Sequence, residues 1–191
     1  NHINQVNNPE KDVFEKMINQ KQPLVITNVL GELAFTTEEI EQRDNVSLKK
    51  KVKDHFKYYL TPLSYDFSLK ILFDKKGIAT SLVKQINHRI LIASVKGIKK
   101  IVLFNPDQTK YLYKSKITPN KSEVNFWQYS SEVYPNFSKS NYIEIIIREN
   151  QMISIPYGWW WTSICETDCL SVICYNDSLF SCIFKKMGVI N

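Results

Sequence analysis

The chain contains very little arginine. Of its 25 basic residues only Arg43, Arg89 and Arg148 are arginines. Proteins that recognise a nucleic-acid sequence usually rely on arginine side chains that fork onto base edges, so this composition argues against specific nucleic-acid binding. The net charge of +6 comes from an excess of lysines over acidic residues. Lysine, asparagine and isoleucine are all abundant, as the codon bias of an AT-rich genome would produce. We expect the lysine-rich residues 49–53 and 96–100 to be a solvated helix face and a strand turn.

Long apolar segments are also absent. No apolar run approaches the roughly 20 residues that cross a bilayer, and the N-terminus has neither a secretion signal nor an amphipathic transit pattern. We therefore expect no membrane span and a protein that is intracellular or held in an assembly, not secreted. Repeats and low-complexity tracts are missing as well. With 191 residues, 43% of them hydrophobic and 13% aromatic, residues 1–191 should form a single domain with a substantial core.

Residues that commonly bind metals are few. Of three histidines, His88 is the one near the motif discussed below, and we interpret it as a satisfied or solvent-facing histidine in a turn. The four cysteines, Cys165, Cys169, Cys174 and Cys182, lack the Cys-x-x-Cys spacing of structural zinc sites. We predict that they pack in the core as reduced thiols. The sequence thus predicts no metal site built from histidine or cysteine.

Helices are predicted in the first third of the chain. Residues 8–10, Asn-Pro-Glu, have the features of a helix start. The apolar residues that follow at helical spacing are Val13, Met17 and Ile18. A short helix is predicted at residues 36–42 and a longer one at residues 47–60. The apolar face of the longer helix is expected to consist of Leu48, Val52, Phe56 and Leu60.

The remainder of the chain is predicted to be mostly β. Strands are expected at residues 24–29, 69–73, 90–95, 100–104, 142–148, 152–155 and 170–175, with turns at Lys76-Gly77, Lys96-Gly97 and Glu149-Asn150. Strands at this spacing after N-terminal helices favour a double-stranded β-helix, or jelly roll, with a small helical annex. We assign residues 1–66 to the annex with the first strand, 67–176 to the barrel and 177–191 to a C-terminal tail. In that tail Phe180 and Phe184 would share one helical face.

Residues 155–161, Ile-Pro-Tyr-Gly-Trp-Trp-Trp, resemble the signature of the JmjC and cupin-like superfamily of 2-oxoglutarate oxygenases. There the run is a strand that ends in Pro-x-x-Trp-Trp-His, whose His is the last ligand of a catalytic iron. Further segments resemble family landmarks in the same order, at residues 22–29, 96–108, 111–113, 122–126 and 134–137. The last two are most similar to those of the asparaginyl hydroxylase that inhibits hypoxia-inducible factor. The resemblance covers most of residues 20–176 and implies a mostly β, cupin-type jelly roll.

This resemblance places the iron ligands at positions without suitable donor atoms. Trp161 stands at the final His, and an indole N–H donates a hydrogen bond but offers no lone pair to a metal. Thr80 matches a Thr three positions before the family's His-x-Asp, which puts Val83 at the His and Gln85 at the Asp. A register shifted by one residue supplies Lys84 and Ile86 instead. Neither register restores the two imidazoles and one carboxylate that such an iron site needs.

Two residues match the family's contacts to 2-oxoglutarate. Lys99 follows Gly97 by two positions, where the family has a lysine that pairs with the distal carboxylate, and Thr80 would assist it. The alternative is that Lys99 is an ordinary lysine at a strand end. A metal contributes most of the binding of 2-oxoglutarate, and the ligand positions for that metal are lost. We therefore expect no cofactor and interpret Thr80 and Lys99 as a remnant of the site.

These observations predict a non-enzymatic JmjC-like cupin domain, a pseudoenzyme that serves as a structural or interaction subunit of a larger assembly. One alternative is a degenerate module whose cleft still binds a peptide or a small acid. An active Fe(II) and 2-oxoglutarate oxygenase would require all three ligand positions to be misassigned.

The expected partners are other protein subunits. Little sequence follows residue 176, where the family often has helices that mediate dimerisation, so the family homodimer is not expected. The chain begins without methionine, so we expect a processed or partial gene product. Together with the AT-rich bias, this indicates an assembly in a protist organelle or cilium, or in a giant-virus particle.

Overall fold

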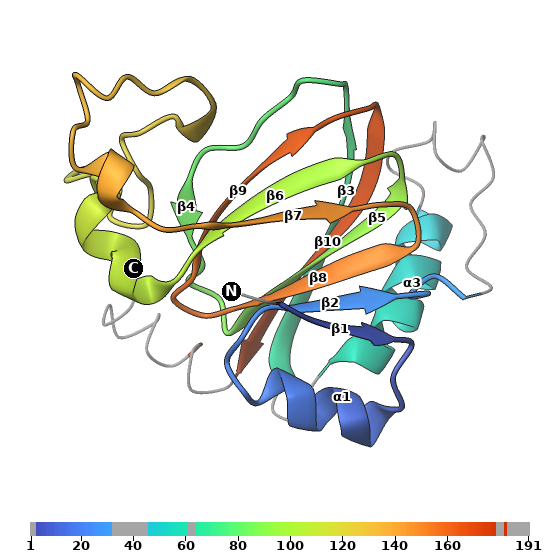
Figure 1. Cartoon of the computed structure of the whole chain (residues 1–191). Helices are drawn as coiled ribbons and strands as arrows, with labels where there is room; N and C mark the ends of the chain where they lie inside the picture. The colour runs from blue at the N-terminus through green and yellow to red at the C-terminus, as the bar shows by residue number, and fades with distance from the viewer. Residues whose placement is uncertain (1–2, 32–45, 61–63, 179–181, 183–191) are drawn as a thin grey trace.

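The computed structural model describes residues 3–31, 46–60, 64–178 and 182, and these residues form two facing β-sheets (Figure 1). The first sheet has the strand order β1-β2-β8-β5-β10-β3 and the second the order β4-β9-β6-β7. The pairing of β1 with β2 is parallel, and the other pairings within the described sheets are antiparallel. This arrangement confirms the predicted mostly β class with the architecture of a jelly roll.

The strands are β1 (Asn4–Asn7), β2 (Leu24–Thr27), β3 (Ser64–Asp74), β4 (Val83–Lys84), β5 (Arg89–Lys96), β6 (Lys99–Phe104), β7 (Ile143–Ile147), β8 (Gln151–Pro156), β9 (Trp160–Cys165) and β10 (Cys169–Ser178). Six of the seven predicted strands therefore match within a few residues, and β3 is several residues longer than predicted because it pairs with β10 along its length. Three strands were not predicted, namely β1, β4 and β9. The predicted turns are present, with positive φ at Gly77, Gly97 and Asn150.

The first sheet carries the helices on its outer face. α1 (Lys11–Ile18) and α3 (Val46–Phe56) pack there, and α3 continues into a 3-10 turn, η1 (Lys57–Tyr59). The predicted face of α3 is confirmed at Val52 and Phe56, which are fully buried. None of the helices in the described parts of the chain has the length and apolarity needed to cross a membrane. The predicted helix at residues 36–42 and the tail phenylalanines lie outside the described residues.

The predicted start of the first helix was wrong by two residues. Its N-cap is Glu10, because Asn8 takes a positive φ and donates its backbone N–H to the carbonyl of Thr27, which continues the pairing of β1 with β2. The buried face of this helix is made by Phe14 and Ile18, whereas Val13 is exposed. Because β1 and β2 extend the six-stranded sheet, the N-terminal segment is part of the jelly roll as well as its helical cover.

The core consists of three layers of apolar side chains. The inner cluster lies between the sheets and includes Ile92 of β5, Ile101 of β6 and Ile153 of β8. A second cluster joins the outer face of the six-stranded sheet to the helices. A third lies on the outer face of the four-stranded sheet, where the β6–β7 connection, residues 105–142, packs over Phe104 and Trp160. Alternate residues of β6 and β9 thus face either the inner cluster or this third one.

Candidate functional site

Val83 and Trp161 lie directly opposite each other in the structure. β4 pairs antiparallel with β9, and the register joins Val83 to Trp161. On its other side β9 pairs with β6, which places Leu103 across from Trp161. Residues opposite each other on adjacent strands project to the same face of a sheet. Two residues that the sequence assigned to one metal site are therefore neighbours inside the barrel.

The Trp161 side chain fills part of the space between the two sheets. It is 7% exposed and belongs to the inner cluster, with Val83 packed against that cluster. Within the described structure its indole Nε1 is buried and has no hydrogen-bond partner. An unpaired buried N–H costs about 1 to 3 kcal/mol, so apolar contacts must hold the ring in place. Trp161 therefore acts here as an apolar side chain.

Gln85 is buried beside this pair and is held by its neighbours. Its amide Nε2 donates to the carbonyl of Asn87 at 3.2 Å, and only 3% of the residue is exposed. Its backbone N–H donates to the carbonyl of Trp159, and its own carbonyl accepts from Gly158. Of Val83, Gln85 and Trp161, only Gln85 has a side-chain oxygen, and a neutral amide oxygen is a poor iron ligand. This donor set does not fit a non-haem iron.

Lys99 is buried at the opposite end of β6 and already has an anionic partner. Its ammonium Nζ lies 3.2 Å from Oδ2 of Asp74, which ends β3. The Lys99 side chain is 3% exposed and that of Asp74 is 24% exposed. Cys165 stands opposite Lys99 on β9, and desolvation by burial raises the pKa of its thiol to about 12, so the thiol stays neutral. The sequence offered no signal for Asp74, because it lies 25 residues from Lys99.

Thr80 is held against β9 rather than against Lys99. Its Oγ1 accepts a hydrogen bond from the backbone N–H of Ser163 at 2.8 Å, and its carbonyl accepts from Oγ1 of Thr162 at 2.7 Å. Thr80 also lines a small cavity of about 290 Å³ together with residues 79–81 and 121–125. None of its hydrogen bonds in the described structure reaches Lys99. The two predicted contacts to 2-oxoglutarate are therefore engaged with separate protein partners.

The remaining candidate ligands do not assemble into a site. His88 lies in a bend just before β5, where a turn was predicted, and burial lowers the pKa of its imidazole. Cys165, Cys169 and Cys174 are buried as predicted, whereas Cys182 is only partly buried. Among residues 3–31, 46–60, 64–178 and 182, no group of three or more His, Cys, Asp or Glu side chains is placed to hold a metal ion.

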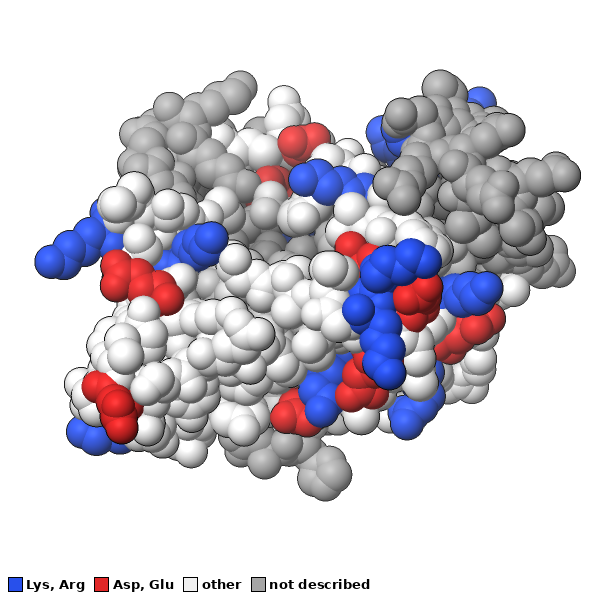
Figure 2. Space-filling model, turned by 90° about the horizontal axis from the view of Figure 1, so that it is seen from above, with Lys and Arg blue, Asp and Glu red and all other residues white. Residues whose placement is uncertain are grey.

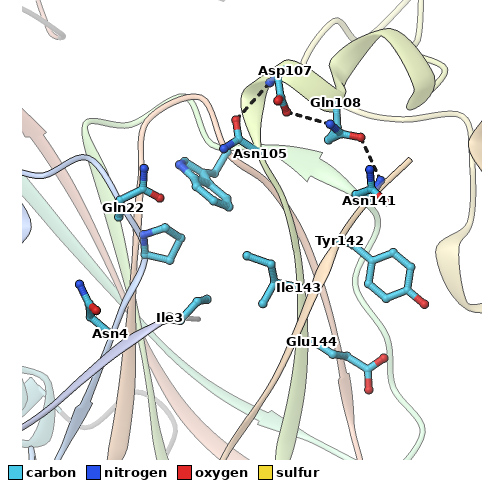
Figure 3. A pocket seen from close by; sticks show the side chains of 12 residues that line it. Ile3, Asn4, Gln22, Asn105, Asp107, Gln108, Asn141, Tyr142, Ile143 and Glu144 are labelled. Carbon is cyan, nitrogen blue, oxygen red and sulfur yellow. Dashed lines mark hydrogen bonds between the residues drawn. The ribbon is translucent and has the colours of Figure 1, made fainter. Parts of the chain in front are cut away.

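A larger cavity of about 900 Å³ lies between β1 and β7, at the other edge of the inner cluster (Figure 3). It is lined mainly by polar side chains from five separate segments. Segments 22–29, 96–108 and 155–161 contribute to this lining, but the cavity could not be predicted because its residues come together only in the folded barrel. Val83, Gln85 and Trp161 do not line this cavity, although Trp159, two residues before Trp161, does.

Comparison with known proteins gives two findings. The model of the cupin-like domain matches residues 76–174, just over half of the chain. The tRNA wybutosine-synthesizing protein 5 of Danio rerio is similar, with 34% identity over 70 residues that cover 36% of this chain and 21% of that protein. The chain therefore matches only about a fifth of the length of this curated relative.

Proposed function

The chain belongs to the cupin-like domain family, and we propose that it is a non-catalytic member that serves as a structural or interaction subunit of a larger assembly. The pairing of Val83 with Trp161 in the inner core carries this proposal. If these two residues stand where the JmjC-type oxygenases have iron ligands, an indole and an isopropyl group occupy the place of the metal and its water. A barrel filled in this way retains its scaffold without its chemistry.

The donor set supports this proposal. An oxygen-activating iron of this type needs two imidazoles, one carboxylate and open coordination positions. Val83 and Trp161 supply no lone pair for a metal, and the amide of Gln85 is hydrogen-bonded to Asn87. A rebuilt site would therefore require three substitutions together with a cavity in which water and oxygen could bind.

The ion pair of Lys99 with Asp74 argues against retained binding of a small dicarboxylate. In the resembling oxygenases a lysine at this position holds the distal carboxylate of 2-oxoglutarate. Here the chain supplies its own carboxylate to Lys99. An acid ligand would have to displace Asp74 and leave that carboxylate without its partner, which costs free energy that binding must recover. We therefore favour the subunit over the alternative of an acid-binding module.

The name of the similar Danio rerio protein raises tRNA modification as an alternative. Nucleic-acid binding usually needs a continuous basic surface. On the face drawn in Figure 2, acidic side chains lie among the lysines and arginines and interrupt any such surface. The donor set at Val83, Gln85 and Trp161 also argues against the oxygen chemistry of the superfamily. We therefore do not transfer this relative's activity to the chain.

Isolation from the native source tests the subunit role. A tagged copy of the chain, purified under mild conditions, should elute in a high-mass complex with other proteins in fixed molar ratios. Elution as a free monomer at the same ionic strength would contradict the proposal. A second preparation at high salt distinguishes non-specific capture by lysines, which salt reverses, from an apolar interface, which persists.

Restoring the ligands tests whether the barrel was repacked. The triple variant Val83→His, Gln85→Asp, Trp161→His restores the residue types of the facial triad but not the space around them. We expect it to be less stable than the wild type and to bind no iron, because it brings new polar groups and a void into an apolar core. Trp161→Phe serves as the matched control for lost ring volume. Stoichiometric iron binding with an unchanged melting temperature would favour a preformed ligand pocket instead.

A further inference from the structure

The cavity of about 900 Å³ lies where the edges of the two sheets meet. β1 is the outermost strand of the six-stranded sheet, and β7 is the outermost strand of the four-stranded sheet. In Figure 3, Asn4 and Gln22 border the cavity on one side, and Tyr142 and Glu144 border it on the other. Its volume is within the range of known ligand sites, roughly 300 to 1,000 Å³. β4, which carries Val83, is at the opposite edge of the four-stranded sheet from β7.

One rim of this cavity is fixed by a chain of hydrogen bonds. The backbone N–H of Asp107 donates to Oδ1 of Asn105 at 3.3 Å, and Nε2 of Gln108 donates to Oδ1 of Asp107 at 3.0 Å. Oε1 of Gln108 then accepts from the backbone N–H of Asn141 at 2.9 Å, as the dashed lines in Figure 3 show. These bonds join the segment after β6 to the segment before β7. Because the rim is held in advance, a ligand would not have to order it on binding.

The lining selects a neutral or basic ligand. Its polar side chains include five carboxamides, those of Asn4, Gln22, Asn105, Gln108 and Asn141. Asp107 and Glu144 add two carboxylates, and none of the described residues that line the cavity is basic. Glu144 also pairs with Lys100, whose Nζ lies 3.2 Å from its Oε1. Phosphates and carboxylates would meet repulsion here, whereas a carboxamide can both donate to and accept from a peptide backbone. Ile3, Pro23, Ile143 and Trp159 provide apolar surface between these polar groups.

The two strands beside the cavity each have an unpaired edge. Within the described sheets β1 pairs with β2 and β7 pairs with β6, so each strand has a second edge without a neighbouring strand. β7 has the sequence Ile-Glu-Ile-Ile-Ile, with Glu144 as its one charged residue. Natural proteins usually protect an apolar edge strand with charges, proline or a cover, because an unprotected edge pairs with other chains. This strand therefore has the composition of an edge that a partner covers.

We propose that this cavity binds an extended, neutral or basic peptide segment of a partner protein, which adds a strand to the free edge of β7. The proposal rests on the interaction role proposed above and names the surface that performs it. Backbone hydrogen bonds to β7 would supply affinity, and the carboxamide rim and Glu144 would select the sequence. The cavity adjoins the inner cluster that contains Trp161, but neither Val83 nor Trp161 lines it, so the proposed contacts do not include these two residues.

Selection from a phage-displayed library of linear 12-residue peptides against the full chain tests the proposal. Enriched peptides, synthesised with a fluorophore and measured by anisotropy, should carry no net negative charge. Methylation of alternate backbone nitrogens in the peptide removes strand pairing while it keeps the side chains. Two peptides are compared, one methylated at odd and one at even positions. We expect one of them to bind at least about tenfold more weakly, because only one of these two sets of N–H groups faces β7.

Charge reversal identifies the surface. Glu144→Lys, which also removes a carboxylate partner of Lys100, should weaken binding of a basic peptide about tenfold. The variant Glu123→Lys, exposed on the β4 side, should leave binding unchanged. Far-UV circular dichroism verifies that both variants are folded. The proposal is wrong if no peptide is enriched, if neither methylation nor Glu144→Lys affects binding, or if a neutral oligosaccharide such as maltoheptaose binds this cavity instead. Iron binding by the wild type would contradict the non-catalytic assignment but not the peptide result, so the two failures are distinguishable.

Discussion

Replacing Trp161 with alanine should lower the free energy of unfolding by about 3 to 5 kcal/mol. The indole is 7% exposed and lies in the inner cluster between the two sheets. Burying an aromatic side chain removes about 150 to 250 Å² from water, which at roughly 25 cal/mol per Å² corresponds to about 4 to 6 kcal/mol. The compactness of the unfolded chain reduces this figure, and the void left by truncation adds to the loss.

Two phenylalanine variants separate the volume of the ring from its hydrogen bonding. Trp161→Phe should cost only about 1 to 2 kcal/mol, because the buried Nε1 of Trp161 has no partner to lose. Trp160 faces the third core cluster, and its Nε1 donates to Oγ1 of Thr109 at 2.9 Å. Trp160→Phe breaks that bond and should cost about 0.5 to 1.5 kcal/mol more than Trp161→Phe.

Urea unfolding followed by far-UV circular dichroism measures these differences without relying on tryptophan fluorescence. The midpoint should shift while the denaturant dependence, the m-value, stays constant, because the variants keep the same fold. A loss of less than about 1 kcal/mol for Trp161→Ala would refute the reasoning. It would mean that the ring is accessible, and a role of Trp161 in contact with a partner would then become the better interpretation.

Three further perturbations test the surrounding structure. Gly97→Ala should destabilise by about 3 kcal/mol or more, because its Cβ would collide with the carbonyl oxygen of Asp168. Gly77→Ala, which has a similar φ but open space around it, should cost only about 1 to 2 kcal/mol in thermal or urea unfolding. Asp74→Ala should lower the free energy of unfolding by about 3 kcal/mol and Lys99→Met by about 1 to 2 kcal/mol, because Asp74→Ala leaves the more deeply buried ammonium of Lys99 unpaired. Equal losses for the two variants would argue that Lys99 finds another partner. The hydrogen bond from Lys75 is the main reason that the pKa of Asp168 lies below its ordinary 3.8. The contribution of Asp168 to the free energy of unfolding is therefore complete above pH 3.8 and is lost as the pH falls below it. The Asp168→Asn variant should lose less stability than the wild type over this acid range in unfolding measured against pH.

Most of the fold could be predicted because its strands have local signals. The strands at residues 90–95 and 100–104 are continuous apolar runs bounded by Gly97, and both are present as β5 and β6. β9 was missed because both of its faces are buried and because its polar residues Thr162 and Ser163 are buried too, so it is neither an alternating pattern nor a continuous apolar run. β1 was missed for the opposite reason. Three of its four residues are polar amides, and its strand structure comes from pairing with β2.

The candidate site could be predicted in part. The resemblance to the oxygenases brought Val83 and Trp161 together, and the structure pairs them. The partner of Lys99 could not be predicted, because Asp74 is at the end of a different strand and the sequence between them has no motif. The cavity between β1 and β7 was missed for the same reason, since its lining comes from segments separated by many residues that only the closed barrel brings together.

The iron content of the purified chain tests the non-catalytic assignment most directly. The protein would be incubated anaerobically with excess Fe(II) and 2-oxoglutarate, separated from free metal by gel filtration, and analysed for bound iron and, after exposure to oxygen, for succinate. Because Val83, Gln85 and Trp161 provide no adequate ligand set, we predict substoichiometric iron and no succinate above a protein-free control. About one iron per chain, together with succinate formation, would contradict the assignment and identify the domain as an active oxygenase.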